Sequence, residues 1–252
     1  MEIIPLGDSA LVVRVREQFE DAPDETLDEV RRVFQLLQRA AIPGVIELAP
    51  AYTSVAVFFD PDTILKTNRA ASGAFESLGT RIHSAVAGVG GRGRAKRKTS
   101  RVIEIPLCYD REFAPDLDDV AKHAEISAQE VVDLHSTSKY RVACIGFVPG
   151  FTFLAGLPRN LGTPRRDVPR KEIPSGSVGI GGVQTGIYPL RSPGGWNLIG
   201  RTPLKLFDPS KNPPTLLHPG DRVRFRAITR EEFAALGADP PNDNQRFSLG
   251  SE

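Results

Sequence analysis

The sequence predicts two folded parts, an α+β N-terminal domain and a C-terminal domain that is a small β-barrel or sandwich. Three observations predict this division. Residues 1–87 alternate strand-like and helix-like segments in the order ββαββα. Residues 88–100 contain five basic residues and no apolar periodicity. From residue 138 onward, short apolar segments are separated by Pro and Gly, which is typical of all-β domains.

The order ββαββα is expected to give a four-stranded antiparallel sheet with two helices on one face. A turn at Gly7 and Asp8 separates the first two strands. The first helix begins at Asp24 and is stopped by Pro43 and Gly44. Its predicted apolar face consists of Leu27, Val30, Phe34, Leu37 and Ala41.

Two further strands, in residues 44–50 and 52–60, precede a second helix that opens at Pro61. Gly88, Gly90 and Gly93 follow this helix and match the spacing G-x-G-x-x-G. A dinucleotide-binding loop needs a strand before that motif and a helix after it. Because the order here is reversed, residues 88–100 are interpreted as a flexible basic linker. The apolar residues expected in the second helix are Ile64, Leu65, Phe75, Leu78 and Ile82.

The C-terminal domain is predicted to cover residues 101–237, followed by a disordered tail over 238–252. It begins with a strand and continues with two short helices. Ser127 and Glu130 form a predicted capping box for the second of these helices, which ends near His135. The later apolar segments supply the remaining strands.

Composition excludes several classes of function. A net charge of +1 argues against a general nucleic-acid binder or a membrane-surface protein. No apolar run approaches the ~20 residues of a membrane span, and the N-terminus lacks the basic start of a signal peptide. Cys108 and Cys144 each lie in an apolar run and are expected to be small buried side chains. These features predict a cytoplasmic protein.

The histidines are far apart in the sequence, so no metal site is expected. His135 is the most interesting of them, because it lies at a helix end just before an apolar strand. A helix C-terminus favours the charged form of histidine. Two interpretations remain open, an ordinary helix-terminal histidine and a group that transfers a proton.

Two segments have the composition of a binding site. Residues 163–174 carry Arg165, Arg166, Arg170 and Lys171 between prolines, and fixed guanidinium groups suit carboxylate or phosphate ligands. The alternative is a solvated basic loop whose charge is partly offset by Asp167 and Glu172. The glycine-rich residues 176–200 resemble a phosphate-cradling loop, but no helix follows them, so we interpret them as turns between strands.

Within this glycine-rich segment, Gln184 and Thr185 suit recognition of an amide or lactam edge. Several glycines beside them would let the backbone approach a ligand closely. Trp196 is either a stacking surface for a flat ligand or a core residue.

Two long motifs of the C-terminal domain resemble one protein family. "DLHSTSKYRVACIGFVPGFTFLAGLP" and "GTPRRDVPRKEIPSGSVGIGGVQTGIYPLRSPGGWNLIGRTP" are similar to the family that includes the B component of 5-oxoprolinase, KipI kinase inhibitors and the allophanate hydrolase type of subunit 1. "IEIPLCYD" and "LGDSALVV" fit the family more loosely, so the resemblance spans most of the chain. The chain departs from the family pattern at Asp133, where Glu is common, and at Ser175, where Ala is common.

This resemblance implies an α+β N-terminal domain, a cyclophilin-like β-barrel, and partners of the C type and A type that together open 5-oxoproline to glutamate with ATP and Mg²⁺. We assign His135 and Arg166 to catalysis as hypotheses. The other residues assigned to substrate or ATP binding are Arg165, Arg170, Ser177, Gln184, Thr185, Tyr188 and Trp196. Two alternatives stay open, an inhibitor of a sensor histidine kinase and a component of allophanate or urea amide hydrolysis.

Overall fold

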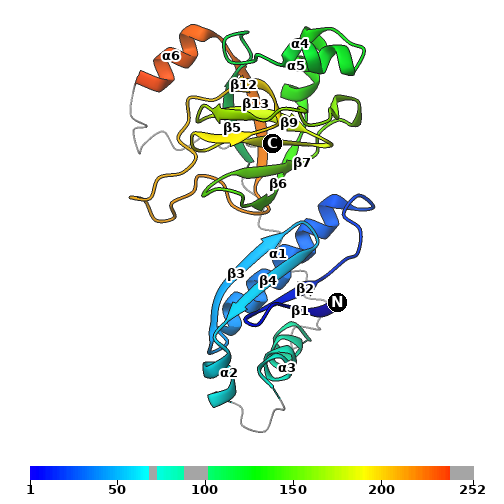
Figure 1. Cartoon of the computed structure of the whole chain (residues 1–252), viewed down its shortest axis with the longest axis vertical. Helices are drawn as coiled ribbons and strands as arrows, with labels where there is room; N and C mark the ends of the chain where they lie inside the picture. The colour runs from blue at the N-terminus through cyan, green and yellow to red at the C-terminus, as the bar shows by residue number, and fades with distance from the viewer. Residues whose placement is uncertain (68–72, 88–101, 239–252) are drawn as a thin grey trace. The chain divides into compact units, whose positions relative to one another are not determined.

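A computed structural model describes residues 1–67, 73–87 and 102–238 of the chain (Figure 1). The chain divides into two compact units, Met1–Lys98 and Thr99–Glu252. The predicted linker and tail, residues 88–100 and 238–252, lie outside the described residues except for Ala238. Within the described part of the chain, no helix is both long enough and apolar enough to cross a membrane.

The N-terminal unit contains one antiparallel sheet in the strand order β1-β2-β4-β3. The sequence predicted a single helix after β4, but the structure has two helices there, α2 and α3. Leu65 was expected on the apolar face but is 39% exposed, whereas Ile64 beside it is fully buried. The elements are β1 (Glu2–Leu6), β2 (Ala10–Arg14), α1 (Pro23–Ala40), β3 (Val45–Ala51), β4 (Ser54–Phe59), α2 (Pro61–Thr67) and α3 (Ala74–Ala87).

Side-chain alternation explains how this unit forms its core. Strand residues two apart point to the same face of a sheet, so Leu11 and Val13 share the face that packs against the helices. Leu78 and Ile82 of α3 and Leu37 of α1 complete this core. The predicted stripe packs in this core through Val30 and Leu37, whereas Ala41, expected on the same face, lies beyond the end of α1 and is exposed.

The C-terminal unit is a closed barrel of seven strands in the order β6-β13-β5-β12-β9-β10-β7, with β7 pairing back onto β6. Strands β13 and β5 are parallel and lie side by side, while the other neighbours are antiparallel (Figure 1). Of the two expected classes, barrel and sandwich, the structure is the barrel. The strands are β5 (Val102–Cys108), β6 (Tyr140–Ile145), β7 (Thr152–Ala155), β9 (Ser177–Gly181), β10 (Gln184–Ile187), β12 (Asn197–Arg201) and β13 (Arg222–Ile228).

Helices α4 (Leu117–His123) and α5 (Ala128–Thr137) contribute Val120 and Val131 to the barrel core. The predicted capping box is confirmed: the Ser127 N–H donates to Glu130 Oε2 at 2.8 Å, and the Glu130 N–H donates to Ser127 Oγ at 3.2 Å. The remaining elements of the unit are η1 (Arg159–Leu161), β8 (Arg170–Ile173), which pairs with β11 (Ser192–Gly194), and α6 (Arg230–Ala238).

Helix α6 was missed by the sequence analysis, although a signal was present. Thr229 and Glu232 repeat the capping-box spacing. In the structure, the Thr229 N–H donates to Glu232 Oε2 at 3.0 Å, and the Glu232 N–H donates to Thr229 Oγ1 at 3.2 Å. Both cysteines are free thiols; Cys108 is buried as expected, whereas Cys144 is only half-buried.

Candidate functional site

The glycines of strands β9 and β10 make room for a tryptophan of the same chain. A Cβ on Gly181 would lie 2.6 Å from the indole ring of Trp196, and one on Gly186 would lie 2.9 Å from Trp196 Cζ3. A Cβ on Gly179 would lie 3.1 Å from Trp196 Cβ. The expectation that a ligand approaches the backbone here is therefore wrong at these three positions, because the indole fills the space.

Trp196 belongs to an aromatic cluster that is closed to solvent. Its indole is 4% exposed and meets the ring of Phe151 edge-on at 5.5 Å between centroids. Phe151 meets the ring of Tyr188 in the same way at 4.9 Å. Burial raises the pKa of Tyr188 to about 12, although a backbone hydrogen bond to Trp196 and the charges of nearby arginines lower it. Of the two interpretations of Trp196, the structure matches the core residue.

Two of the three arginines proposed for ligand binding are held by one buried carboxylate. Arg170 donates to both oxygens of Asp116, from Nη1 at 2.8 Å and from Nη2 at 2.7 Å, and Arg166 Nη1 donates to Asp116 Oδ1 at 2.7 Å. The backbone N–H of Leu198 donates to Asp116 Oδ2 at 2.7 Å. The Asp116 side chain is 2% exposed, so these are charge-assisted bonds in a water-poor environment.

Sequence analysis missed Asp116 because it lies 50 residues before Arg166. Of the two acids expected to offset the arginines, Glu172 instead pairs with Arg191 at 2.8 Å. Arg165 differs from its two neighbours. Its guanidinium carbon lies 6.0 Å from the centre of the Trp196 ring, and it has no carboxylate partner among the described residues. Arg165 is therefore an exposed cation, as Lys171 is, and it is stabilised by an aromatic face.

His135 is fully buried, and both ring nitrogens have partners. Nδ1 lies 2.7 Å from the hydroxyl of Tyr109, and Nε2 lies 3.2 Å from Thr185 Oγ1. Because Thr185 Oγ1 donates its only hydrogen to the carbonyl of Gly179 at 3.0 Å, it accepts from His135. The neutral ring is therefore protonated at Nε2, and the Tyr109 hydroxyl donates to Nδ1.

The expected charged form of His135 is not supported. Burial lowers the pKa of His135 to about 3, which outweighs the helix C-terminus. The ring also stacks on Phe225, with centroids 4.6 Å apart. In this arrangement His135 links helix α5 to strands β9 and β10, and it offers no free nitrogen to a substrate.

The remaining assigned residues occupy the same strands. Ser177 is 2% exposed in β9, and its carbonyl accepts from the Tyr188 N–H at 2.8 Å. Gln184 is half-buried at the start of β10, opposite Gly181. Two groups emerge from the assigned residues: a histidine group, His135 with Thr185, and an arginine–aromatic group, Arg165, Arg166, Arg170, Tyr188 and Trp196. Thr185 bonds to the carbonyl of Gly179, which packs against Trp196, so Gly179 connects the two groups.

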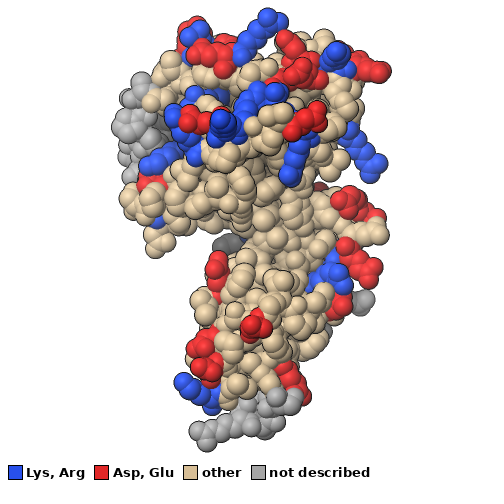
Figure 2. Space-filling view, in the orientation of Figure 1, with Lys and Arg blue, Asp and Glu red and all other residues tan. Residues whose placement is uncertain are grey.

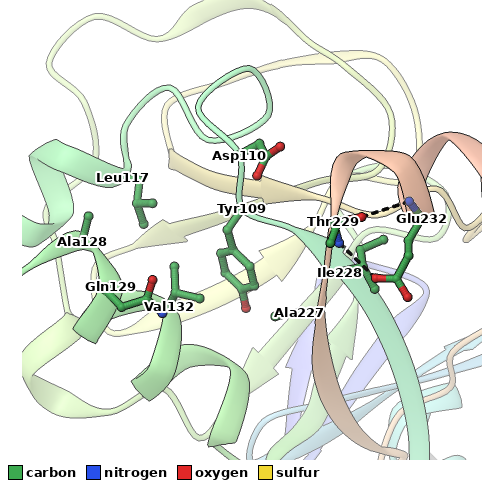
Figure 3. A pocket seen from close by; sticks show the side chains of 10 residues that line it. All are labelled: Tyr109, Asp110, Leu117, Ala128, Gln129, Val132, Ala227, Ile228, Thr229 and Glu232. Carbon is green, nitrogen blue, oxygen red and sulfur yellow. Dashed lines mark hydrogen bonds between the residues drawn. The ribbon is translucent and has the colours of Figure 1, made fainter.

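A separate cleft of about 420 Å³ opens beside α5 and α6. Figure 3 shows Tyr109 between Val132 on one side and Ala227 and Ile228 on the other. Glu232 lies at the rim, where its hydrogen bonds to Thr229 cap α6. The cleft is related to the histidine group because Tyr109 is common to both.

Neither of the two segments with the composition of a binding site forms a phosphate cradle among the described residues. The glycines that resembled a phosphate loop pack against Trp196, and Arg166 and Arg170 are engaged by Asp116. In the described part of the chain, no group of three or more His, Cys, Asp or Glu side chains is arranged to hold a metal ion. Figure 2 shows basic and acidic side chains interspersed over the visible face of the barrel unit.

Comparison with known proteins identifies the family that this chain matches. The carboxyltransferase domain, subdomain C and D family matches residues 1–217. The B component of 5-oxoprolinase from Bacillus subtilis is 42% identical, with 93% of this chain and 95% of that protein covered. The crystal structure of TTHA0988 has a TM-score of 0.71 and 36% identity, covering 87% of this chain and 39% of that one. Urea amidolyase of Saccharomyces cerevisiae is 29% identical over 60% of this chain and 10% of its own length.

Proposed function

The chain belongs to the carboxyltransferase subdomain C and D family, and we propose that it is the B component of an ATP-dependent 5-oxoprolinase. The observation that carries the proposal is its similarity to the B component of the Bacillus subtilis 5-oxoprolinase, which extends over 95% of that protein. Similarity along nearly the whole length supports a shared role more strongly than a shared fold alone. The protein would act with a C-type and an A-type subunit.

The arginine–aromatic group suits the chemistry of this reaction. Opening the 5-oxoproline lactam places negative charge on the carbonyl oxygen, and the substrate itself carries a carboxylate. A preorganised cation stabilises such charge. Arg165 has the position for this role, because it is exposed and fixed over Trp196. The buried Asp116 would then hold Arg166 and Arg170 in place beside it.

Asn197 helps to fix this segment. Its side-chain amide donates to the carbonyl of Pro164 at 2.8 Å and to that of Ile180 at 3.2 Å. The residue before Arg165 is thereby tied to strand β9. Positioning of this kind matters because small displacements of a charged group weaken its stabilisation of a transition state.

We propose that His135 serves this site by holding neighbouring residues in position, without contacting the substrate. Its hydrogen bond to Thr185 fixes β10, and Gln184 precedes Thr185 on that strand. A direct proton transfer by His135 would require Tyr109 or Thr185 to release a ring nitrogen first. ATP, with Mg²⁺, would supply the activated phosphoryl group, but neither the glycine-rich segment nor the Arg166–Arg170 pair forms a cradle for it, and we derive no step through it.

The test is reconstitution. The chain is combined with the C-type and A-type subunits from the same organism, and glutamate released from 5-oxoproline is measured with and without ATP. We expect glutamate only when this chain and ATP are both present. Equal release without this chain would refute the proposal.

A second candidate, a component of urea or allophanate hydrolysis, is favoured by the similarity to urea amidolyase. The same reconstituted mixture is therefore offered allophanate and urea in parallel. Ammonia release from either compound that depends on this chain, without glutamate release from 5-oxoproline, would select this candidate.

A further inference from the structure

The cleft beside α5 and α6 is a cavity that the arginine–aromatic group does not use. Its walls come from four parts of the barrel unit: the residues after β5, α4, α5 and the segment from β13 to α6. Its volume of about 420 Å³ lies in the range of small-molecule pockets. Most of the lining is apolar or aromatic: Tyr109, Leu117, Ala128, Val132, Ala227 and Ile228.

The polar side chains of the lining mainly offer hydrogen-bond acceptors. Gln129 donates from Nε2 to Asp133 Oδ1 at 2.9 Å, and no described residue donates to its Oε1. Asp110 and Glu232 contribute carboxylates, which only accept hydrogen bonds. A ligand that satisfies these groups must therefore bring N–H or O–H donors.

The charge around the cleft is negative and is only partly compensated. No basic side chain is among the described residues that line it. Arg226 reaches Glu232 from outside the lining, with Nη1 3.5 Å from Oε1. Asp110 is exposed, and Arg111 beside it in the chain pairs with Asp118 at 3.3 Å. The Asp110 carboxylate is therefore compensated less than that of Glu232, and it favours a cationic donor such as an ammonium group.

Tyr109 connects the cleft to the buried His135. Its hydroxyl donates to His135 Nδ1 at 2.7 Å, so the ring offers the cleft mainly carbon atoms. Figure 3 shows this ring between Val132 and Ile228, which supply apolar surface on either side. A ligand that contacts Tyr109 therefore lies one side chain away from His135, whose ring nitrogens report on its binding.

We propose that this cleft binds a small organic cation, with an ammonium group at Asp110 and an apolar body between Val132 and Ile228. The carboxylate supplies charge-assisted hydrogen bonds, and the apolar walls remove the carbon surface of the ligand from water. Anionic compounds are repelled by the same carboxylates. This site is independent of the proposed function, because the cleft and the arginine–aromatic group share no residue.

Three probes of similar shape test the preference for positive charge: phenethylamine, 2-phenylethanol and 3-phenylpropionate, which are cationic, neutral and anionic at pH 7. Each is titrated into the full chain labelled with ¹⁵N at histidine, and the ring-nitrogen resonances are followed by NMR. We expect phenethylamine to shift the His135 resonances saturably, with a Kd at least about tenfold lower than that of 2-phenylethanol. 3-Phenylpropionate should leave these resonances unchanged, and His83, in the N-terminal unit, should respond to none of the probes.

Two variants locate the site. Asp110→Asn removes the charge but keeps the shape, and should raise the Kd of phenethylamine about 5- to 10-fold. Ala128→Leu fills the cleft from the first residue of α5 with a good helix former, and should abolish binding. The control is Asp119→Asn, which changes the net charge by the same amount at an exposed residue of α4 outside the lining, and should leave Kd unchanged.

A free amine and a lysine side chain of another protein both carry an ammonium group on an apolar stem. Nα-acetyl-lysine methylamide, titrated in parallel, distinguishes these two sources. We expect it to bind more weakly than phenethylamine, because the apolar walls bury more of an aromatic body. A Kd below that of phenethylamine would overturn the assignment to a free small molecule.

Several results would overturn the site itself. Equal affinity for phenethylamine and 2-phenylethanol would mean that the cleft selects for apolar surface alone. Equal losses in Asp110→Asn and Asp119→Asn would mean that the amine responds to overall charge. Phenethylamine that fails to bind, that leaves the His135 resonances unchanged, or that still binds to Ala128→Leu would show that the cleft is not its site.

Discussion

Replacing Asp116 by asparagine should destabilise the barrel unit strongly, because this side chain connects three distant parts of the chain. Asp116 stands before α4, Arg166 and Arg170 belong to the proline-rich segment, and Leu198 belongs to β12. An asparagine can keep one acceptor oxygen for Leu198. Its amide nitrogen is a donor, however, and would face a guanidinium group that is also a donor.

The magnitude follows from the contacts. Hydrogen bonds to charged groups contribute roughly 1.5–3 kcal/mol each, and the carboxylate accepts three from the two guanidinium groups. The side chains of Arg166 and Arg170 are 34% and 25% exposed, so water can hydrogen-bond to them in the variant and offset part of the lost free energy. The net cost is about 3 kcal/mol, at the lower end of the values for breaking a buried pair. This corresponds to a fall in melting temperature of about 6–12 °C.

The assay is thermal unfolding followed by circular dichroism at low and high salt. The matched control is Asp118→Asn, two residues further along, whose carboxylate is 69% exposed and lies 3.3 Å from an Arg111 side chain that is 90% exposed. The control should cost less than about 1 kcal/mol, and that cost should decrease with salt. In a chain that already carries Arg170→Met, Asp116→Asn should lower the free energy of unfolding by less than it does in the wild-type chain.

If Asp116→Asn and Asp118→Asn lower the melting temperature by the same small amount, the reasoning is refuted. The carboxylate would then contribute no more than an exposed ion pair, and the organisation of Arg166 and Arg170 would have another cause. A large shift that disappears in high salt would also contradict it, because a side chain that is 2% exposed is shielded little by ions.

Two further predictions concern the glycines and the buried histidine. Gly181→Ala places a Cβ 2.6 Å from the Trp196 ring and should lower the free energy of unfolding by about 1–3 kcal/mol. Gly79→Ala, in a helix where no atom lies within 4 Å of the new Cβ, should raise it by about 0.5–1 kcal/mol. Melting temperatures that shift in the same direction for both variants would contradict this contrast. His135 has a pKa of about 3 when folded and ~6.5 when unfolded, so the unfolded chain binds more protons between these values and stability falls as pH falls from 6.5 towards 3. At pH 5, calorimetry should record about one proton fewer taken up on unfolding of His135→Gln than of the wild type, and equal uptake by the two chains would contradict this prediction.

The parts of the fold that sequence predicted well are those encoded by neighbouring residues. The spacing of Leu27, Val30 and Leu37 placed the first helix, and Ser127 with Glu130 marked the start of α5. These signals act within a few residues, so a single sequence contains them completely. The class of the C-terminal unit is not encoded locally, because the density of turns indicates a barrel and a sandwich equally.

The site was predicted less well, because its contacts join distant segments. Nothing near Asp116 indicates that it binds Arg166 and Arg170, and a carboxylate followed by a helix is common at a surface. Likewise, Gly181 and Trp196 stand on either side of several turns, and their mutual packing appears only when β9 and β12 pair. Residue types singled out this segment of the chain, whereas the contacts that each side chain makes there depend on the tertiary fold.

Strand β13 gives the barrel an unusual order of assembly. Residues 222–228 fit between β5 and β6, parallel to the first and antiparallel to the second, and all other barrel strands precede them in the chain. During synthesis, β5 and β6 therefore leave the ribosome long before the strand that separates them. Until residue 228 has emerged, their edges stay unpaired and open to other chains. We infer that a ribosome stalled before β13 would carry an open, aggregation-prone sheet in place of a barrel.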